Sequence, residues 1–152
     1  MKENGYLKVR YNGKTVERFI KQYDIVLCDL GEGMGCEKRG FRPCVIVSNN
    51  ILNKSSSNIM IVPLTNMINK RNKNGTIDLM ATHIILSNKF YRQLNKTSIV
   101  QTEDLRSVSK NRILEWIGDL SKQDEEKIKQ ALKFTLGLES EGMAVWVKLF
   151  LK

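Results

Sequence analysis

Apolar and polar residues alternate from Leu7 to Arg18, and Asn12-Gly13 interrupts the alternation. Alternation with period two is typical of a strand with one buried face. An Asn-Gly pair between two such runs is the strongest short signal for a β-hairpin. The pattern therefore predicts a small hairpin near the N-terminus, although residues 16–22 are also compatible with a helical turn.

Five apolar runs rich in Val and Ile follow, and turn-forming or polar residues separate them. They cover residues 24–30, 43–48, 59–65, 76–86 and 97–102. Each has the length and composition of a strand. Repeated short strands separated by turns predict a compact, barrel-like sheet.

Arg42-Pro43 joins a glycine-studded loop, residues 31–41, to the second of these runs. Proline has no amide hydrogen, so Pro43 is expected at the first residue of a strand. The residue before a proline is confined to extended conformations, which limits the backbone of Arg42. The sequence therefore predicts that the side chain of Arg42 has a restricted direction. The simpler alternative is that Arg-Pro only marks a strand edge and that Arg42 is one more solvated charge.

One helix is predicted near the C-terminus. Ser121 can cap it, acidic residues occupy its first turn, and Gly137 stands past its end. Its expected buried stripe consists of Ile128, Ala131, Leu132, Thr135 and Leu136. Residues 143–151 form an apolar tail too short to span a bilayer, which we expect to be an extra strand or a dimer contact.

Composition changes this picture mainly through charge. The chain has 152 residues, which suits one globular domain, but its net charge is +9. Such a protein attracts polyanions, of which nucleic acid is the commonest, while an anionic membrane surface or an acidic partner stays open. Because neither a signal region nor a bilayer-spanning run is found, we expect a cytoplasmic protein.

The cysteines and the histidine indicate neither a disulfide framework nor a zinc site. Cys28, Cys36 and Cys44 are odd in number and eight residues apart, and His83 is the only histidine. We expect the cysteines to be small buried hydrophobes in a reducing compartment. His83 lies in an apolar run, so a structural histidine is expected.

Several motifs occur together in a fixed order. They are Asp24-Ile-Val-Leu, Glu37 and Gly40, the segment from Arg42-Pro43 to Asn49, the segment from Ser98 to Arg106, and Leu136-Gly-Leu138. In this order the sequence resembles the MazF/PemK family, the toxin halves of toxin-antitoxin pairs. The resemblance covers residues 23–138 of a single domain, 1–152, and leaves residues 1–22 and 139–152 as extensions. It departs from the family at Tyr23, usually glycine, and at Asp104, often glutamine.

The resemblance implies a mainly β, α+β fold: a small SH3-like antiparallel barrel with a C-terminal helix. It also implies a homodimer without a cofactor or metal, a cognate acidic antitoxin as partner, and an endoribonuclease that cuts single-stranded RNA at short sequences. Arg42 and Thr65 match the family's catalytic pair, and Glu37 matches an acidic position near the site. From their charge, the loop residues Lys38, Arg39, Lys70, Arg71 and Lys73 are expected to line a groove for RNA, and Ser48, Asn49 and Arg106 are also expected to bind it.

The residues suit this chemistry. The ribose 2′-OH can attack the adjacent phosphorus, so the enzyme must remove one proton, stabilise phosphoryl charge and protonate the leaving oxygen. The guanidinium of Arg42 binds phosphate well and is a poor base. Glu37 is therefore a candidate base, or a group that orients Arg42, with a solvated loop charge as the alternative. A gyrase-inhibiting toxin and a catalytically silent RNA-binding module stay open, because fold does not fix function.

Overall fold

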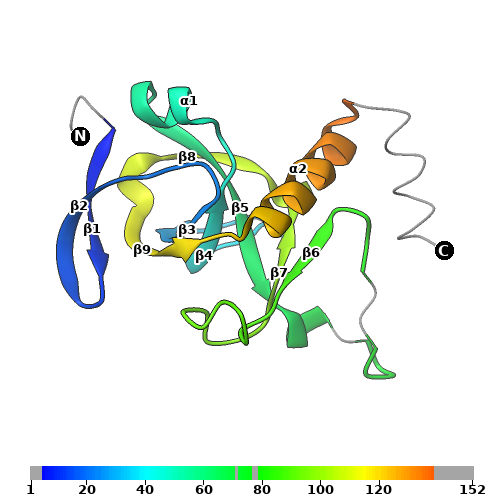
Figure 1. Ribbon diagram of the computed structural model, residues 1–152. Helices are drawn as coiled ribbons and strands as arrows, with labels where there is room; N and C mark the ends of the chain where they lie inside the picture. Colours follow the sequence, from blue (N-terminus) through cyan, green and yellow to red (C-terminus); the bar gives the residue numbers. More distant parts are fainter. Residues whose placement is uncertain (1–4, 71, 77–78, 139–152) are drawn as a thin grey trace. The chain divides into compact units, whose positions relative to one another are not determined.

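The computed structural model describes residues 5–70, 72–76 and 79–138 (Figure 1). The chain forms two compact units and crosses between them three times. Unit 1 comprises Met1–Leu64 and Asp104–Leu120, and unit 2 comprises Thr65–Glu103 and Ser121–Lys152. The two units are described in turn, and the expectation of one domain over residues 1–152 stays a prediction.

Unit 1 is built on an antiparallel sheet. Its strands are β1 (Tyr6–Tyr11), β2 (Lys14–Phe19), β3 (Asp24–Asp29), β4 (Phe41–Ile46), β5 (Asn58–Asn66, which ends in unit 2), β8 (Arg106–Ser109) and β9 (Ile113–Asp119), together with the helix α1 (Asn50–Ser55) and the 3-10 turn η3 (Lys110–Arg112). The hydrogen-bonded order is β2-β1-β9-β3-β4-β5, and β8 pairs with β5. Among the strand pairs described for this unit, only β1 with β9 is parallel.

The N-terminal hairpin is confirmed. Asn12 and Gly13 have φ values of 51° and 77°, the left-handed conformation that a two-residue hairpin turn requires at both positions. Strand β2 runs to Phe19, so the alternative of a helical turn beginning at residue 16 is wrong. Leu7 and Val9 face inward and join the core cluster of unit 1. The hairpin is therefore an integral part of this unit.

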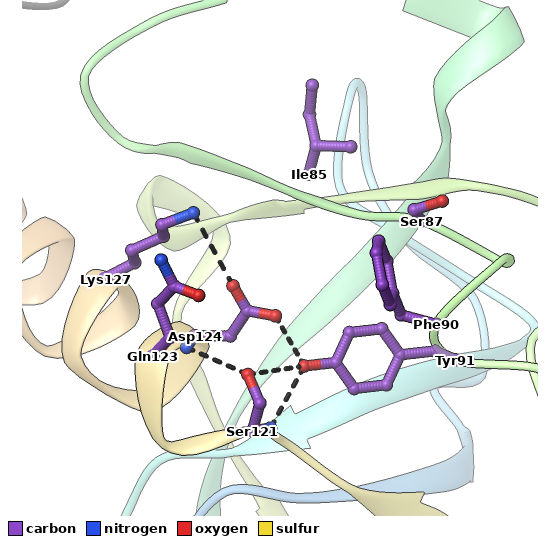
Figure 2. A pocket seen from close by; sticks show the side chains of 8 residues that line it. All are labelled: Ile85, Ser87, Phe90, Tyr91, Ser121, Gln123, Asp124 and Lys127. Carbon is purple, nitrogen blue, oxygen red and sulfur yellow. Dashed lines mark hydrogen bonds and ion pairs between the residues drawn. The ribbon is translucent and has the colours of Figure 1, made fainter.

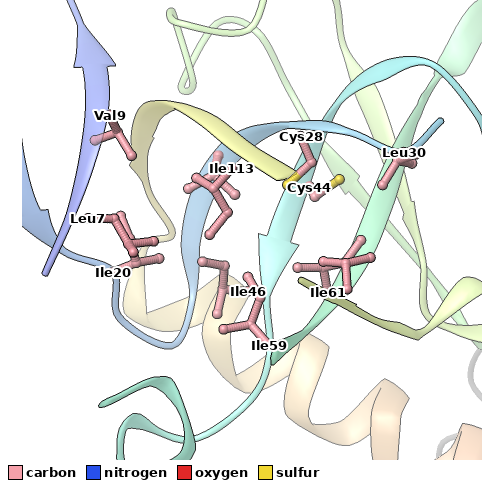
Figure 3. Packing of buried hydrophobic residues seen from close by; sticks show 12 residues of the cluster. Leu7, Val9, Ile20, Cys28, Leu30, Cys44, Ile46, Ile59, Ile61 and Ile113 are labelled. Atoms are coloured by element: carbon pink, nitrogen blue, oxygen red, sulfur yellow. The ribbon is translucent and has the colours of Figure 1, made fainter. Parts of the chain in front are cut away.

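The core of unit 1 gathers buried side chains from β1, β3, β4, β5, β8 and β9 (Figure 3). Its largest members include Ile20, Leu30, Ile46, Ile59 and Ile61, each at most 2% exposed. Cys28 and Cys44 lie among them at 0% exposure, as expected from the sequence. Cys36 is exposed in the loop before β4, so the expectation of burial was wrong for this residue.

Unit 2 contains the hairpin β6 (His83–Leu86) and β7 (Ser98–Gln101), the helix α2 (Lys122–Leu136), and the 3-10 turns η1 (Met67–Lys70) and η2 (Thr102–Asp104, which ends in unit 1). The strand predicted over residues 76–86 forms from His83 to Leu86, and the prediction is wrong for the described residues 79–82. There the His83 N–H donates to the Met80 carbonyl and closes a turn.

The helix α2 is confirmed with the expected caps. Ser121 accepts a hydrogen bond from the Asp124 amide, and Gly137 ends the helix with φ of 68°. Ile128 and Ala131 are fully buried. Leu136 is 53% exposed, because it lies in the last turn of the helix, so its place in the predicted buried stripe was wrong.

These elements confirm the mainly β, α+β class with a C-terminal helix. The hydrogen-bonded strand order of the described residues runs from one end to another without returning to its start, so the predicted barrel-like sheet is not closed. In the described part of the chain, no helix has both the length and the apolar composition needed to cross a membrane. The apolar tail, residues 143–151, lies outside the described residues.

Candidate functional site

Arg42 is held by two backbone carbonyls of unit 1. Its Nε donates to the Arg39 carbonyl at 3.1 Å, and its Nη1 donates to the Leu64 carbonyl at 3.1 Å. The side chain is half-buried. Among the described residues Nη2 has no acceptor, so this end of the guanidinium can donate to a ligand.

The register of the sheet explains the contact with Leu64. Strands β4 and β5 pair Cys44 with Pro63, which places Pro43 opposite Leu64 one step further on. The Val47 amide donates to the Met60 carbonyl at 2.9 Å, and hydrogen-bonded pairs recur at every second position of an antiparallel ladder. Pro43 therefore stands at a hydrogen-bonded position without an amide hydrogen, and Arg42 supplies the missing donor to the Leu64 carbonyl.

The predicted strand start at Pro43 was thus wrong by two residues. Strand β4 begins at Phe41, and Pro43 lies inside it, paired with Leu27 on the β3 side. A proline is tolerated at this interior position because a side chain replaces its hydrogen bond. The expectation of an aimed arginine is consistent with this geometry.

The loop before β4 is anchored to β8 and to the residues preceding it. Arg106 Nη1 donates to the Lys38 carbonyl at 3.4 Å, and Lys38 Nζ lies 3.5 Å from Asp104 Oδ2. The Gly40 amide also donates to the Gly31 carbonyl and closes the base of the loop. Asp104, a departure from the family pattern, thus has a role in this chain as the ion-pair partner of Lys38.

Glu37 is exposed, and its carboxylate is occupied locally. Glu37 Oε2 accepts a hydrogen bond from the Met34 amide at 3.1 Å. In the described part of the chain, no hydrogen bond joins this carboxylate to Arg42. The resting position of Glu37 is therefore that of a group that closes its own loop.

Ser48 and Asn49 hold the helix α1 in place. Ser48 is 5% exposed, its hydroxyl donates to Asn53 Oδ1, and it accepts from the Met60 amide at 3.1 Å. Asn49 caps α1 by accepting from the Leu52 amide at 3.0 Å. These contacts assign Ser48 a structural role, whereas Asn49 is exposed.

The remaining predicted residues are distributed over both units. Thr65 follows Leu64 in β5 and is 6% exposed. Arg39 is exposed and its Nη2 donates to the Gly35 carbonyl at 3.4 Å. Lys73 is exposed. The side chain of Lys70 and the whole of Arg71 lie outside the described residues.

His83 has a structural environment, as expected. It is 9% exposed, its Nδ1 accepts from the Met80 amide, and its Nε2 lies 2.9 Å from Glu103 Oε2. An Nδ1 that accepts leaves Nε2 as the protonated nitrogen, which donates to Glu103. The side-chain nitrogen of Gln101, Nε2, lies 3.3 Å from His83 Nε2.

Sequence reasoning missed a pocket in unit 2. It has a volume of about 340 Å³. Figure 2 shows its wall, with Phe90 and Tyr91 facing the first turns of α2. The Tyr91 hydroxyl donates to Asp124 Oδ2 and accepts from the Ser121 amide at 3.0 Å. Burial, with a smaller contribution from the Asp124 hydrogen bond, raises the pKa of Tyr91.

Comparisons with a family model and with a curated protein both point to the MazF/PemK toxins. Residues 21–136 match the family model of the PemK-like, MazF-like toxin of type II toxin-antitoxin systems. An endoribonuclease MazF of Staphylococcus saprophyticus is 31% identical over 121 residues, which cover 80% of this chain and 94% of that protein.

Solved structures share the fold, and two of them are given as examples. A mycobacterial endoribonuclease in complex with its cognate antitoxin is 24% identical with a TM-score of 0.61, over 80% of this chain and 98% of that chain. MazF of Deinococcus radiodurans is 18% identical with a TM-score of 0.61, over 78% of this chain and 96% of that chain.

Proposed function

The chain belongs to the PemK-like, MazF-like toxins of type II toxin-antitoxin systems, and we propose that it is an endoribonuclease that cuts single-stranded RNA with Arg42 at its active site. The relative that is 31% identical is an endoribonuclease MazF. The observation that carries the assignment of the site is the guanidinium of Arg42, held at two of its nitrogens and free to donate at Nη2.

The proposed reaction uses the substrate's own nucleophile. The 2′ oxygen forms a bond to phosphorus and loses its proton to a base, while the bond from phosphorus to the 5′ oxygen breaks and that oxygen is protonated. The products are a 2′,3′-cyclic phosphate and a 5′-OH end. Arg42 stabilises the negative charge that builds up on the phosphoryl oxygens, since a pre-positioned cation does so without reorganising during the reaction.

Thr65 and Glu37 complete the proposed site. The hydroxyl of Thr65 donates to the phosphate or accepts from the 2′-OH. Glu37 is the base, or orients Arg42, once RNA displaces its hydrogen bond to the Met34 amide. Opening of the loop accompanies this step, which the glycines at residues 31, 33, 35 and 40 permit.

RNA contacts outside the reacting phosphate come from Lys38, Arg39, Asn49, Lys70, Arg71, Lys73 and Arg106. Arg106 and Lys38 also shape the loop before β4. The net charge of +9 supports a polyanionic ligand. We infer that the protein is a homodimer, works in the cytoplasm, where messenger RNA is found, and is held inactive by a cognate acidic antitoxin that competes with RNA for the basic surface.

The test separates a nuclease from the two alternatives. The purified protein is incubated with a long single-stranded RNA and, separately, with DNA gyrase and relaxed plasmid. The proposal predicts discrete RNA cuts and unchanged supercoiling. Inhibited supercoiling with intact RNA would identify a gyrase poison, and RNA that is bound but uncut would identify a silent binding module.

A further inference from the structure

We propose that the pocket of unit 2 is a second RNA subsite, in which one unpaired nucleobase stacks on Phe90 while the loop around it binds the adjoining phosphates. The inference rests on the proposed function, because it assigns a further contact to the same substrate. The subsite lies outside the residues that the family resemblance assigned to catalysis or RNA binding.

Phe90 is the first reason. Its side chain is 86% exposed, the highest value among the exposed large hydrophobic residues of the described chain. A single exposed apolar residue is common on protein surfaces, but this ring stands at the opening of a pocket, where its free face is available for a base to stack on. Figure 2 shows the ring beside the opening that Tyr91 and the residues of α2 enclose.

The ring is exposed although its loop is well anchored. The amides of Phe90 and Tyr91 both donate to the Ser87 carbonyl, at 3.1 and 2.9 Å. The neighbouring Tyr91 is 9% exposed, and its hydroxyl is fixed to Asp124 and Ser121 on α2. Phe90 is thereby presented to solvent on a pre-organised loop, which reduces the entropy lost when a ligand binds.

The charge of the loop that carries Phe90 favours a negatively charged ligand. The loop from Ser87 to Thr97 carries three cations, Lys89, Arg92 and Lys96, and contains no acidic residue. All three side chains are exposed. Cations on the same loop as an exposed aromatic ring match a nucleotide, which combines a flat base with a negative phosphate.

The pocket also suits a base in size and chemistry. Its volume of about 340 Å³ is at the lower end of the range for small-ligand sites. Gln123 on its rim is exposed, and its amide offers both donors and an acceptor to the edge of a base. A stacked base in single-stranded RNA is typically bound in this way, with sequence preference added by such edge contacts.

The experiment measures binding of a fluorescein-labelled, unstructured RNA by anisotropy, with all variants made on the cleavage-deficient Arg42→Ala background. Phe90→Leu, which keeps an apolar side chain and removes the aromatic face, is expected to weaken binding by roughly five-fold or more, as loss of one stacked base does. Phe90→Tyr restores a ring and should restore affinity. Ile51→Ala, a change at a 79% exposed apolar residue of α1, is the matched control and should leave affinity unchanged.

A charge pair of variants tests the loop. Lys89→Gln with Arg92→Gln should lower the dependence of log Kd on log salt by about 1.4, the value for two phosphate contacts to a single strand. The control variant, Lys122→Gln with Lys129→Gln, removes two exposed cations of α2 and should lower the salt dependence of Kd by less. Equal affinity for Phe90→Leu and its parent would overturn the subsite.

The cleavage assay keeps the two proposals apart. In the otherwise wild-type chain, Phe90→Leu should raise KM and leave kcat at saturating RNA unchanged. If the wild-type chain cuts RNA and Phe90→Leu has the same KM, the subsite is wrong while the proposed function stands. If the wild-type chain cuts no RNA, the proposed function is wrong, and the anisotropy series still decides whether Phe90 binds RNA.

Discussion

Arg42 Nη1 lies 3.1 Å from the Leu64 carbonyl oxygen, at the place in the sheet where Pro43 has no amide hydrogen to offer. The proline and the arginine that precedes it therefore act together. Proline creates an unsatisfied acceptor on β5, and the arginine satisfies it and is thereby positioned. Leu64 is followed in the chain by Thr65, the other residue of the proposed catalytic pair.

The first prediction concerns Pro43→Ala. The new amide donates to the Leu64 carbonyl and competes with Arg42. The free energy of unfolding should change by less than about 1 kcal/mol, because one hydrogen bond is gained and the rigidity of proline is lost. RNA cleavage should fall by roughly one to two orders of magnitude as the guanidinium loses its position.

The other proline provides the control. Pro63 is opposite Cys44, a non-hydrogen-bonded position towards β4, so Pro63→Ala adds no donor to the Leu64 carbonyl. Its kcat/KM should stay closer to the wild-type value. Full activity of Pro43→Ala would mean that the Leu64 contact does not position Arg42.

Tyr91→Phe tests the anchor between the loop from Ser87 and the helix α2. The change leaves the Asp124 carboxylate and the Ser121 amide without the hydroxyl that they share. Urea unfolding should show that the free energy of unfolding falls by about 1–3 kcal/mol in this variant. Tyr11→Phe, at a tyrosine that is 39% exposed, should change stability by less than about 0.5 kcal/mol. Equal effects of the two variants would refute the anchoring role.

Asp24 makes stability depend on pH. Burial raises its pKa above 3.8, against a hydrogen bond from the Lys21 amide and attraction to Arg18. A carboxyl with a raised folded pKa destabilises the fold as the pH rises from about 3.8 through that pKa, because the folded state retains the proton that the unfolded state has lost. Asp24→Asn keeps an acceptor for Lys21 and removes this titration.

The stability of Asp24→Asn relative to wild type should therefore be higher at pH 7 than at pH 3.5. Urea unfolding at the two pH values measures this difference directly. A larger difference at pH 3.5 would show that the Lys21 hydrogen bond and the attraction to Arg18 outweigh the burial of the carboxylate, and a pH-independent difference would show that they cancel it.

The cysteines should differ in reactivity. Cys36 is exposed, whereas Cys28 and Cys44 are buried, and a hydrogen bond with Cys28 and burial raise the pKa of the Cys44 thiol. Ellman's reagent should titrate one thiol per native chain and all three in guanidinium chloride. In Cys36→Ser the native value should drop to zero. Rapid reaction of a second thiol in the native protein would contradict the buried pair.

Local patterns predicted the elements that depend on neighbouring residues. The Asn12-Gly13 turn and the caps of α2 at Ser121 and Gly137 are of this kind. Pairing over long sequence distances was harder to predict. The start of β4 at Phe41 depends on its pairing with Asp29 of β3, and the position of the Arg42 side chain depends on a carbonyl 22 residues away. The role of Asp104 depends on its ion pair with Lys38. Strand β6 begins as late as His83 because the His83 ring accepts a hydrogen bond from the Met80 amide and holds the turn before it.

In the candidate site, too, local features were predictable from the sequence and long-range contacts were not. The position of Arg42 before a proline indicated a restricted arginine, but not the acceptors that hold it. Burial of Ser48 follows from its bonds to Asn53 and Met60, which no local pattern reveals. Phe90 gave no signal, because a pair of aromatic residues between two cations is unremarkable until the fold shows Tyr91 buried and Phe90 86% exposed.

The central claim is that Arg42 is the electrostatic centre of an RNA-cutting site that needs no metal. The most direct measurement incubates wild-type protein and Arg42→Ala with a long single-stranded RNA in excess EDTA and determines the cut positions and the new ends. The account predicts cuts at a recurring short sequence with 2′,3′-cyclic phosphate and 5′-OH ends, reduced by at least about 10²-fold in Arg42→Ala. Cleavage that EDTA abolishes, or that Arg42→Ala retains, would contradict it.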